Sequence, residues 1–431
     1  MNVQTPPNLL GDPTNELIEQ ARRVLPGGSF GNLPAEVILK EGKGGHIYDE
    51  AGKEYVDFLL GSGPMFIGHA HPDVTAAVQA QVPLGTTFFG NNRHGIALAE
   101  AIVEAVPCAE QVRFVCSGTE ADLYAMRAAR AFRKRDKILK FEGGYHGMSD
   151  YALVSLAPKS PGNFPRGSID SAGIPKSVAD EMVVAAFNDI DMVRSLIEEQ
   201  KDELAGVIVE PFQRLIPPKP GFLQALREVT AEHGIPLIFD EVVTGFRFAY
   251  GGAQEYYGVT PDLCTLGKIV GGGFALAAIA GRADIMKHFD RLAMTDEDFI
   301  FQVGTLSGNP VAAVAGLATL DVLKRPGTYE GVFANGRKLM DALSELIRKH
   351  GFKAQVIGEP PLFDIIFTDQ PIKDYRDTLK ADTAILKRFN QALRARGIMK
   401  GDSKYYVSVA HTQADIDHTI RAWEEAFQEI K

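Results

Sequence analysis

Short apolar runs alternate with amphipathic stretches through the middle of the chain, and this alternation restricts the possible folds more than any other feature. The order is typical of βαβ units, in which helices cover both faces of a mostly parallel sheet. We predict strands at residues 112–116, 137–141, 205–209, 236–239 and 276–280, with helices at 121–135, 190–200 and 222–233. Ser117 and Glu120 form a Ser-x-x-Glu capping box, which indicates the start of the first helix.

The two ends of the chain follow a different pattern. Residues 36–60 predict a small antiparallel element around Gly-rich turns, and amphipathic helices with a few strands follow from about residue 316. A chain of 431 residues also exceeds a single compact core. We therefore predict an α/β fold with a large central domain at residues 71–315 and a small α+β domain assembled from residues 1–70 and 316–431.

The composition excludes several classes of function. The formal net charge is −10, whereas nucleic acids and anionic membranes attract proteins with a basic surface. No apolar run approaches the length of a membrane span, and the first residues lack the basic and apolar regions of a signal peptide. Cys108, Cys116 and Cys264 are too scattered for a disulfide framework or a zinc site, so each is interpreted as a small buried apolar side chain. We therefore predict a protein of the reducing cytoplasm that binds neither nucleic acid nor membrane.

Polar and aromatic side chains follow four of the predicted strands. They are Ser117 and Thr119, Tyr145 and His146, Glu210, and Asp240. Because parallel strands bring their carboxyl ends to one edge of a sheet, we expect these side chains to form one site. Ser117, Gly118 and Thr119 open a helix, so the backbone N–H groups and the helix dipole suit a phosphate, although an ordinary helix cap has the same sequence.

Asp240 and Lys268 carry the most specific chemistry. Asp240 ends an apolar strand, where a carboxylate is costly unless a cation lies beside it. A protonated pyridine nitrogen is such a cation, and enzymes that use pyridoxal 5′-phosphate (PLP) pair it with an Asp. Helix capping and metal binding are the alternatives for Asp240. Lys268 lies among apolar residues and glycines, a setting that lowers the pKa of an amine and favours a nucleophile over a solvated surface charge.

Other motifs do not support a different chemistry. Gly267 and Lys268 are followed by Ile269, so the Ser or Thr of a phosphate-binding P-loop is missing. His69 and His71 have no set of acidic residues around them at ligand spacing, and we interpret them as part of a turn before a helix. No metal site is predicted.

Together these segments resemble the class III (subgroup II) PLP-dependent aminotransferases, and within them the glutamate-1-semialdehyde 2,1-aminomutase branch. The resemblance runs from about residue 22 to residue 427. Its segments are CSGTEAD (116–122), FEGGYHGM (141–148), VEPF (209–212), FDEVVTGFRF (239–248), DLCTLGKIVGGGF (262–274) and VGTLSGNPV (303–311). It implies fold type I of the PLP-dependent transferases, with a mostly parallel seven-stranded sheet in the large domain, and a homodimer with shared active sites. It also implies that the Pro/Gly/Ser-rich segment 157–177 is a mobile gating loop, in agreement with its length and composition.

The resemblance implies roles for the residues around the cofactor ring. Lys268 is similar to the lysine that holds PLP covalently, and Asp240 to the partner of the pyridine nitrogen. Tyr145 looks like the aromatic side chain stacked on the ring, with His146 beside it and Val242 against the opposite face.

It also implies roles at the phosphate and behind the ring. Ser117, Gly118 and Thr119 look like the phosphate cup, and Thr305 like the residue that reaches the phosphate from the neighbouring subunit. Glu210 is similar to a supporting carboxylate near Asp240.

Two segments depart from the aminomutase pattern. Residues 26–34 lack the arginine that takes the substrate carboxylate in those enzymes, and residues 61–65 lack their tryptophan. Arg214, Arg93 and Arg247 are the candidates for binding a substrate carboxylate here, with Arg214 first because it replaces a stretch of small residues after Glu-Pro. For Arg247, one half of a structural ion pair is the preferred interpretation.

The predicted function is transfer of an amino group from a small-molecule donor, an amino acid of the α or β series or an amine, to a keto acid. The first alternative is an aminomutase, which moves the amino group within one molecule. A PLP-fold protein with another activity, such as racemisation, or with no catalysis, is disfavoured because the catalytic set is complete.

Overall fold

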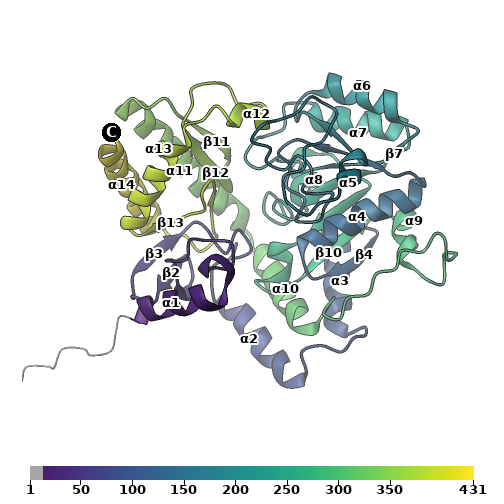
Figure 1. Cartoon of the computed structure of the whole chain (residues 1–431). Coiled ribbons are helices and arrows are strands. Elements are labelled where there is room, and N and C mark those ends of the chain that lie inside the picture. Colours follow the sequence, from purple (N-terminus) through teal and green to yellow (C-terminus); the bar gives the residue numbers. More distant parts are fainter. Residues whose placement is uncertain (1–12) are drawn as a thin grey trace, which may run out of the picture.

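The computed structural model describes residues 13–431. The strands near the amino end and the helices near the carboxyl end lie together on one side of the molecule, and the central part of the chain lies on the other (Figure 1). The prediction that the chain has no signal peptide concerns its first residues, most of which lie outside the described range. Among residues 13–431, none of the helices combines the length and the apolar content that crossing a membrane requires.

Seven strands form the central sheet, in the order β4-β10-β9-β8-β7-β5-β6. β10 is antiparallel to both of its neighbours, and the other pairs are parallel. The strands are β4 (Gln111–Val115), β5 (Lys137–Phe141), β6 (Met182–Ala185), β7 (Leu204–Val209), β8 (Leu237–Glu241), β9 (Leu263–Leu266) and β10 (Ala277–Gly281). The predicted mostly parallel sheet is therefore present.

The sequence placed five of these strands but did not identify β6 and β9. Both are only four residues long, which is too short to show a clear periodicity. β9 also contains a polar residue, Thr265, whose side chain is fully buried because it forms hydrogen bonds. The strand predicted at 112–116 ends at Val115, so Cys116 is the first residue of the loop that follows.

Alternate residues of the central strands pack into separate apolar cores on the two faces of the sheet. In β8, Leu237 and Phe239 belong to one core, together with side chains of α3 (Arg93–Ala105), α6 (Ile190–Gln200) and α7 (Phe222–Glu232). Ile238 belongs to the other core, against α4 (Gly118–Arg133). Helices thus cover both faces, as predicted. The other helices of this part are α2 (Pro72–Gln81), α5 (Lys176–Asp180), α8 (Gly252–Tyr257), α9 (Ala283–Met286) and α10 (Pro310–Leu323).

The predicted capping box fixes the start of α4. Ser117 Oγ accepts a hydrogen bond from the backbone N–H of Glu120, and Glu120 Oε2 accepts one from the backbone N–H of Ser117, each at 3.2 Å. The helix therefore begins at Gly118, earlier than the predicted 121. It ends at Arg133 because Lys134 has a φ of 54°, in the left-handed region.

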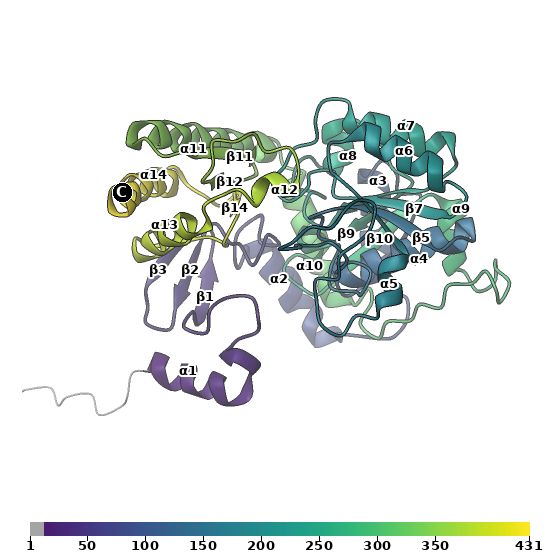
Figure 2. The ribbon, with the colours of Figure 1, turned by 45° about the horizontal axis from the view of Figure 1, so that its top comes forward.

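A second, smaller part combines both ends of the chain (Figure 2). β13 (Ile398–Met399) pairs in parallel with β3 (Glu54–Asp57), and β3 continues an antiparallel meander with β2 (His46–Asp49) and β1 (Leu39–Lys43). The other elements are α1 (Pro13–Val24), α11 (Thr328–His350), β11 (Gln355–Glu359), β12 (Leu362–Ile366), α12 (Tyr375–Thr378), α13 (Thr383–Ala395), β14 (Tyr405–Tyr406) and α14 (Gln413–Ile430). The predicted small α+β unit from both termini is thus present, while its residue boundaries stay a prediction.

The predicted turn around His69 and His71 and the predicted loop at residues 157–177 are both present, with differences in detail. His71 caps α2, as expected for a turn before a helix. His69 does have an acidic partner, because its Nε2 lies 2.7 Å from Asp57 Oδ2, a single carboxylate that arrives from β3. Residues 157–175 contain no helix or strand, but α5 begins at Lys176, so the predicted loop ends slightly earlier. Its role as a gating loop stays a prediction.

Candidate active site

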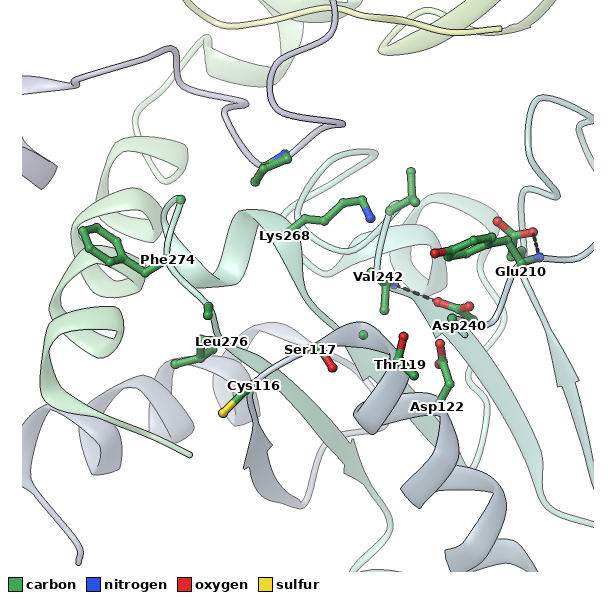
Figure 3. A pocket seen from close by; sticks show the side chains of 17 residues that line it. Cys116, Ser117, Thr119, Asp122, Glu210, Asp240, Val242, Lys268, Phe274 and Leu276 are labelled. Atoms are coloured by element: carbon green, nitrogen blue, oxygen red, sulfur yellow. Dashed lines mark hydrogen bonds between the residues drawn. The ribbon is translucent and has the colours of Figure 1, made fainter. Parts of the chain in front are cut away.

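A cavity of about 350 Å³ lies at the carboxyl ends of the parallel strands. We call it the main cavity. Its lining includes all of the predicted cofactor residues except His146 and Thr305: Ser117, Gly118, Thr119, Tyr145, Glu210, Asp240, Val242 and Lys268 (Figure 3). Segments that are far apart in the sequence meet here because each follows a strand of the same sheet.

The amino end of α4 lines the main cavity. Thr119 Oγ1 accepts a hydrogen bond from the backbone N–H of Met148 at 3.1 Å, which joins this end to the loop after β5. Gly118 is needed for close packing, since a Cβ there would lie 3.1 Å from Val242 Cγ1. The first N–H groups of a helix have no acceptor within the helix, so this end of α4 can bind a phosphate.

Asp240 is the next-to-last residue of β8 and is held in a buried hydrogen-bond network. Its Oδ2 lies 2.8 Å from His146 Nδ1, and its Oδ1 accepts from the backbone N–H of Val242 at 3.1 Å. The hydroxyl of Thr265 donates to Asp122 Oδ1 at 2.6 Å and lies 3.4 Å from Asp240 Oδ1. His146 is therefore in direct contact with Asp240, behind the cavity lining.

Asp122 is a member of this network that the sequence analysis did not select. Burial and the negative charge of Asp240 raise the pKa of Asp122 well above its ordinary value, which favours the neutral form of this carboxyl group. Potential ligand atoms of Asp122, His146 and Asp240 lie within 4.8 Å of one another. The described hydrogen bonds already engage all three side chains, so we interpret the group as a network that orients Asp240. The absence of a metal site stays a prediction.

Lys268 lies two residues after the end of β9 and begins a short 3₁₀ turn (η3, Lys268–Gly271). Its φ of 50° lies in the left-handed region, a strained conformation for a residue with a side chain. Burial lowers the pKa of its amine. Figure 3 shows the side chain extending into the cavity that Asp240 and Val242 also line.

Tyr145 connects the main cavity to a cationic side chain. Its backbone N–H donates to Glu210 Oε2 at 2.9 Å, and burial raises the pKa of both side chains. The guanidinium of Arg214 lies over the Tyr145 ring, 5.4 Å from the ring centroid. The structure thus places Arg214, the first candidate for binding a substrate carboxylate, next to the main cavity.

Three other predicted residues do not line the main cavity. Thr305 lies in an exposed loop, where its carbonyl accepts a hydrogen bond from the Thr87 hydroxyl at 3.2 Å. Arg93 is exposed at the start of α3. The ion pair predicted for Arg247 is wrong: this fully buried side chain donates to the carbonyl oxygens of Val243 and Gly63. It packs over the rings of Phe66 and Tyr406, whose negative faces stabilise its charge.

A second cavity, of about 420 Å³, shares Tyr145 with the main cavity. We call it the side pocket. Its walls come from both parts of the molecule and are largely apolar, with Leu156, Leu215, Ile216, Ile357, Ile365 and Leu386 among them. Arg214 and Lys404 also line it. Burial, together with the positive charge of Arg214, lowers the pKa of Lys404 to about 7. The sequence analysis did not identify Lys404, which follows an irregular stretch with no strand or helix pattern.

The donors of the main cavity fit the functional groups of PLP. The amino end of α4 suits the phosphate, and the buried carboxylate of Asp240 suits a protonated pyridine nitrogen. Lys268 supplies an amine of lowered pKa for the aldehyde. Gly118 and Gly267 leave room around Val242, since a Cβ at either would lie within 3.2 Å of its methyl groups.

Comparison with known proteins gives a consistent result. The sequence profile of the class-III aminotransferases matches residues 29–430. The chain is 40% identical over 426 residues to glutamate-1-semialdehyde 2,1-aminomutase of Desulforudis audaxviator, covering 96% of this chain and 97% of that protein. An omega-transaminase from Sphaerobacter thermophilus superimposes with a TM-score of 0.92 at 39% identity, covering 97% of this chain and 98% of the other. A transaminase with PLP bound has a TM-score of 0.88 at 29% identity, covering 98% and 99% of the two chains.

These structural neighbours and the central sheet confirm the predicted fold class. It is α/β, fold type I of the PLP-dependent transferases, with a seven-stranded sheet and a small unit built from both ends of the chain. Fold alone does not determine the reaction, because one fold carries several chemistries.

Proposed function

Since this chain belongs to the class-III aminotransferase family, as its sequence motifs predicted, we propose that it transfers an amino group between two small molecules. The donor is an amino acid of the α or β series or an amine, and the acceptor is a keto acid. The cofactor is PLP. The observation that carries the proposal is that the Lys268 amine, the Asp240 carboxylate and the amino end of α4 line a single cavity.

The geometry of the main cavity supports a specific task for each residue that would hold PLP. Asp240, oriented by His146 and by the N–H of Val242, would keep the pyridine nitrogen protonated. The side chains of Tyr145 and Val242 would enclose the ring. The amino end of α4 would bind the phosphate through backbone N–H groups and the hydroxyls of Ser117 and Thr119, and Glu210 would fix the backbone of Tyr145.

Lys268 would perform the proton transfer. PLP, when bound, supplies an electron sink that makes the Cα–H of an amino substrate acidic. Among the described residues that line the main cavity, Lys268 is the only lysine, so its Nζ is the group that removes this proton. The lowered pKa of the amine increases the fraction that is unprotonated, and thus basic, near neutral pH.

Intramolecular transfer, as in an aminomutase, is the second candidate. The 40% identity to the aminomutase of Desulforudis audaxviator supports it. The sequence at residues 26–34, without an arginine, and at residues 61–65, without a tryptophan, favours transfer between two molecules instead.

The need for a second substrate separates the two candidates. PLP-loaded protein would be mixed with a panel of amino donors, with and without pyruvate or 2-oxoglutarate, and the keto product and the visible absorbance of bound PLP would be followed. We expect multiple turnovers only when a keto acid is present. Sustained conversion of glutamate-1-semialdehyde without any keto acid would establish the aminomutase, and a protein that takes up no PLP would contradict both candidates.

We also propose a homodimer with shared active sites. Residues 87–92 and 305–308 lie side by side, joined by hydrogen bonds from Thr87 to the Thr305 carbonyl and from Asn92 to the Gly308 carbonyl. The chain around them exposes several large apolar side chains, Leu84, Phe88, Phe89, Phe301 and Leu306, and such a patch is typical of a protein interface. Thr305 would reach the phosphate of the partner's site from here. Sedimentation equilibrium should give twice the chain mass of 46.9 kDa.

The cysteines support the proposed cytoplasmic location. All three are free thiols, as expected in a reducing compartment. Cys108 and Cys264 are buried, as predicted, but Cys116 is partly exposed because it follows β4 at the edge of the main cavity.

A further inference from the structure

The side pocket is lined by two cationic side chains that no carboxylate of the described residues contacts directly. Arg214 and Lys404 both line it. Its acidic side chain, Asp364, is already paired with Lys400, whose Nζ lies 2.8 Å from Asp364 Oδ2 in a fully buried contact. Within the described part of the chain, no carboxylate forms an ion pair or hydrogen bond with Arg214 or Lys404. Neither cation is therefore in direct contact with a described carboxylate, although Glu210 lies within electrostatic reach of both.

Arg214 is held firmly in this position. It lies in a tight turn closed by two backbone hydrogen bonds between Gln213 and Ile216, of 2.8 and 3.1 Å. Its φ of 60° is a left-handed conformation, which is strained for a residue with a side chain. The Tyr145 ring lies beneath the guanidinium and stabilises it through a cation–π contact. Strain that is retained next to an active site is consistent with a ligand-binding role for the side chain.

The electrostatics of the two cations favour an anion between them. Desolvation is the largest cause of the lowered pKa of Lys404, and the charge of Arg214 is the next. The charge of nearby Glu210 raises the pKa of Lys404, but the hydrogen bond of the Glu210 carboxyl group is with the backbone N–H of Tyr145 and not with Lys404. A bound carboxylate would offset both the desolvation and the repulsion, because charge-assisted hydrogen bonds to Arg and Lys are strong in a low-dielectric pocket.

The pair also lies close to the reacting amine. Tyr145 lines both cavities, so the side pocket and the main cavity meet at its ring. Desolvation is the largest cause of the lowered pKa of Lys268, and the positive charge of Lys404 lowers it further. The two amines therefore lie within electrostatic reach of each other. A substrate anchored at Arg214 and Lys404 could therefore present its amino group at Lys268.

We propose that Arg214 and Lys404 together bind the carboxylate of the amino substrate and that the apolar walls of the side pocket take its side chain. The substrate class is thus an amino acid with a large apolar or aromatic side chain. About 420 Å³ accommodates such a group, and most of the exposed wall area is apolar, although polar side chains such as Gln213 and Ser403 also line the pocket. This inference rests on the proposed aminotransferase function.

Binding of a ligand that cannot react tests the proposal without relying on turnover. The PLP-loaded protein would be titrated in a calorimeter with 3-phenylpropanoate, its neutral amide 3-phenylpropanamide, and propanoate. We expect the acid to bind at least tenfold more tightly than the amide, because only the acid carries the anion. Propanoate should bind at least tenfold more weakly than 3-phenylpropanoate, because it lacks the ring that the pocket would bury.

Charge-neutral variants localise the effect. Arg214→Gln and Lys404→Gln should each weaken binding of the acid about tenfold and leave binding of the amide unchanged, and Lys404→Arg should retain the affinity for the acid. Lys387→Gln, on the exposed face of α13, is the matched control and should bind the acid like the wild type.

The proposal is overturned if the wild-type protein binds acid and amide equally well, a result that does not depend on the folding of any variant. It is also overturned if both Gln variants bind the acid with wild-type affinity. Equal affinity for propanoate and 3-phenylpropanoate would remove the assignment of the apolar walls to the side chain. Because none of these ligands has an amino group, a failure here leaves the aminotransferase proposal standing, and an inactive enzyme can still show the selective binding.

Discussion

The main cavity and the side pocket share Tyr145 but are built on different principles. In the main cavity, the side chain of Asp240, near the end of β8, is fixed by His146 and by the peptide N–H of Val242, which lie in loops that follow strands of the same sheet. The side pocket has apolar walls from the central part and from the small unit, together with two cations that no carboxylate contacts directly among the described residues. The difference indicates that the chemistry is fixed within one sheet, whereas substrate choice depends on how the two parts of the molecule meet.

The largest expected effect comes from removing the nucleophile of the main cavity. Lys268→Ala should lower kcat/KM by roughly 10⁴-fold, because no other lysine among its described lining residues can replace the general base. It should also remove the visible absorbance of covalently bound PLP. The exposed Lys287→Ala is the matched control and should retain both. A Lys268→Ala variant with normal absorbance and turnover would disprove the assignment.

Two neighbouring carboxyl groups in the main cavity should differ sharply when altered. Asp240→Asn should lower kcat by roughly 10²- to 10³-fold with a smaller change in KM, because the variant lacks the negative charge that would stabilise the transition state. Asp122→Asn should change kcat less than about threefold, because burial raises the pKa of Asp122 and so favours its neutral form, and an amide oxygen can still accept from Thr265. Steady-state kinetics of both variants provide the measurement, and equal losses would contradict the distinction.

The same contrast explains how much of the site the sequence could predict. Glu210 directly follows β7 and Asp240 lies near the end of β8, so the rule that parallel strands share an edge was sufficient to group them. Asp122 lies within α4, where only the packing of that helix against the sheet brings it to Thr265. Lys404 was not predictable because its surroundings depend on the contact between two units. The proposed role of Thr305 requires a second chain, so the pattern of residues in a single chain does not reveal it.

A contact between the two units should affect the side pocket more than the main cavity. Arg376, on α12, forms a bidentate ion pair with the buried Glu142 after β5, at 2.6 and 3.1 Å, and its guanidinium lies 4.0 Å from the Phe164 ring centroid. It therefore ties the small unit to the loop after β5 and to the predicted gating loop. Arg376→Met should raise KM for an apolar amino acid about tenfold and change kcat much less.

The matched control for this contact is Arg348→Met, which removes an exposed arginine at the end of α11. Its kinetics should equal those of the wild type. A loss confined to kcat in the Arg376 variant, with KM unchanged, would show that the contact between the units serves the chemical step and not substrate choice.

The smallest expected effect is the pH dependence of substrate binding in the side pocket. Lys404 has a pKa of about 7, below the ordinary lysine value, so its charge is present below pH 7 and is lost above it. The charged groups that act on it are Arg214, Glu210, Arg247 and Asp240, with Lys268 also within electrostatic reach, and the two arginines keep their charge throughout this range. Affinity for 3-phenylpropanoate should therefore fall about fivefold from pH 6 to pH 8, with the midpoint shifted upward in the complex because the bound carboxylate favours the charged amine.

Lys404→Arg separates this titration from that of Glu210, whose pKa is raised by burial and whose charge acts on Lys404 from the main cavity. An arginine at position 404 stays charged across the range, so the affinity of the variant for the acid should be flat between pH 6 and pH 8. If the variant keeps the wild-type slope, then Glu210 or another group titrates instead, and the charge of Lys404 does not determine the affinity for the acid. A flat profile in the wild type would show that Lys404 keeps one charge state throughout. The apolar walls and Arg214 would then have to account for any preference between the acid and its amide.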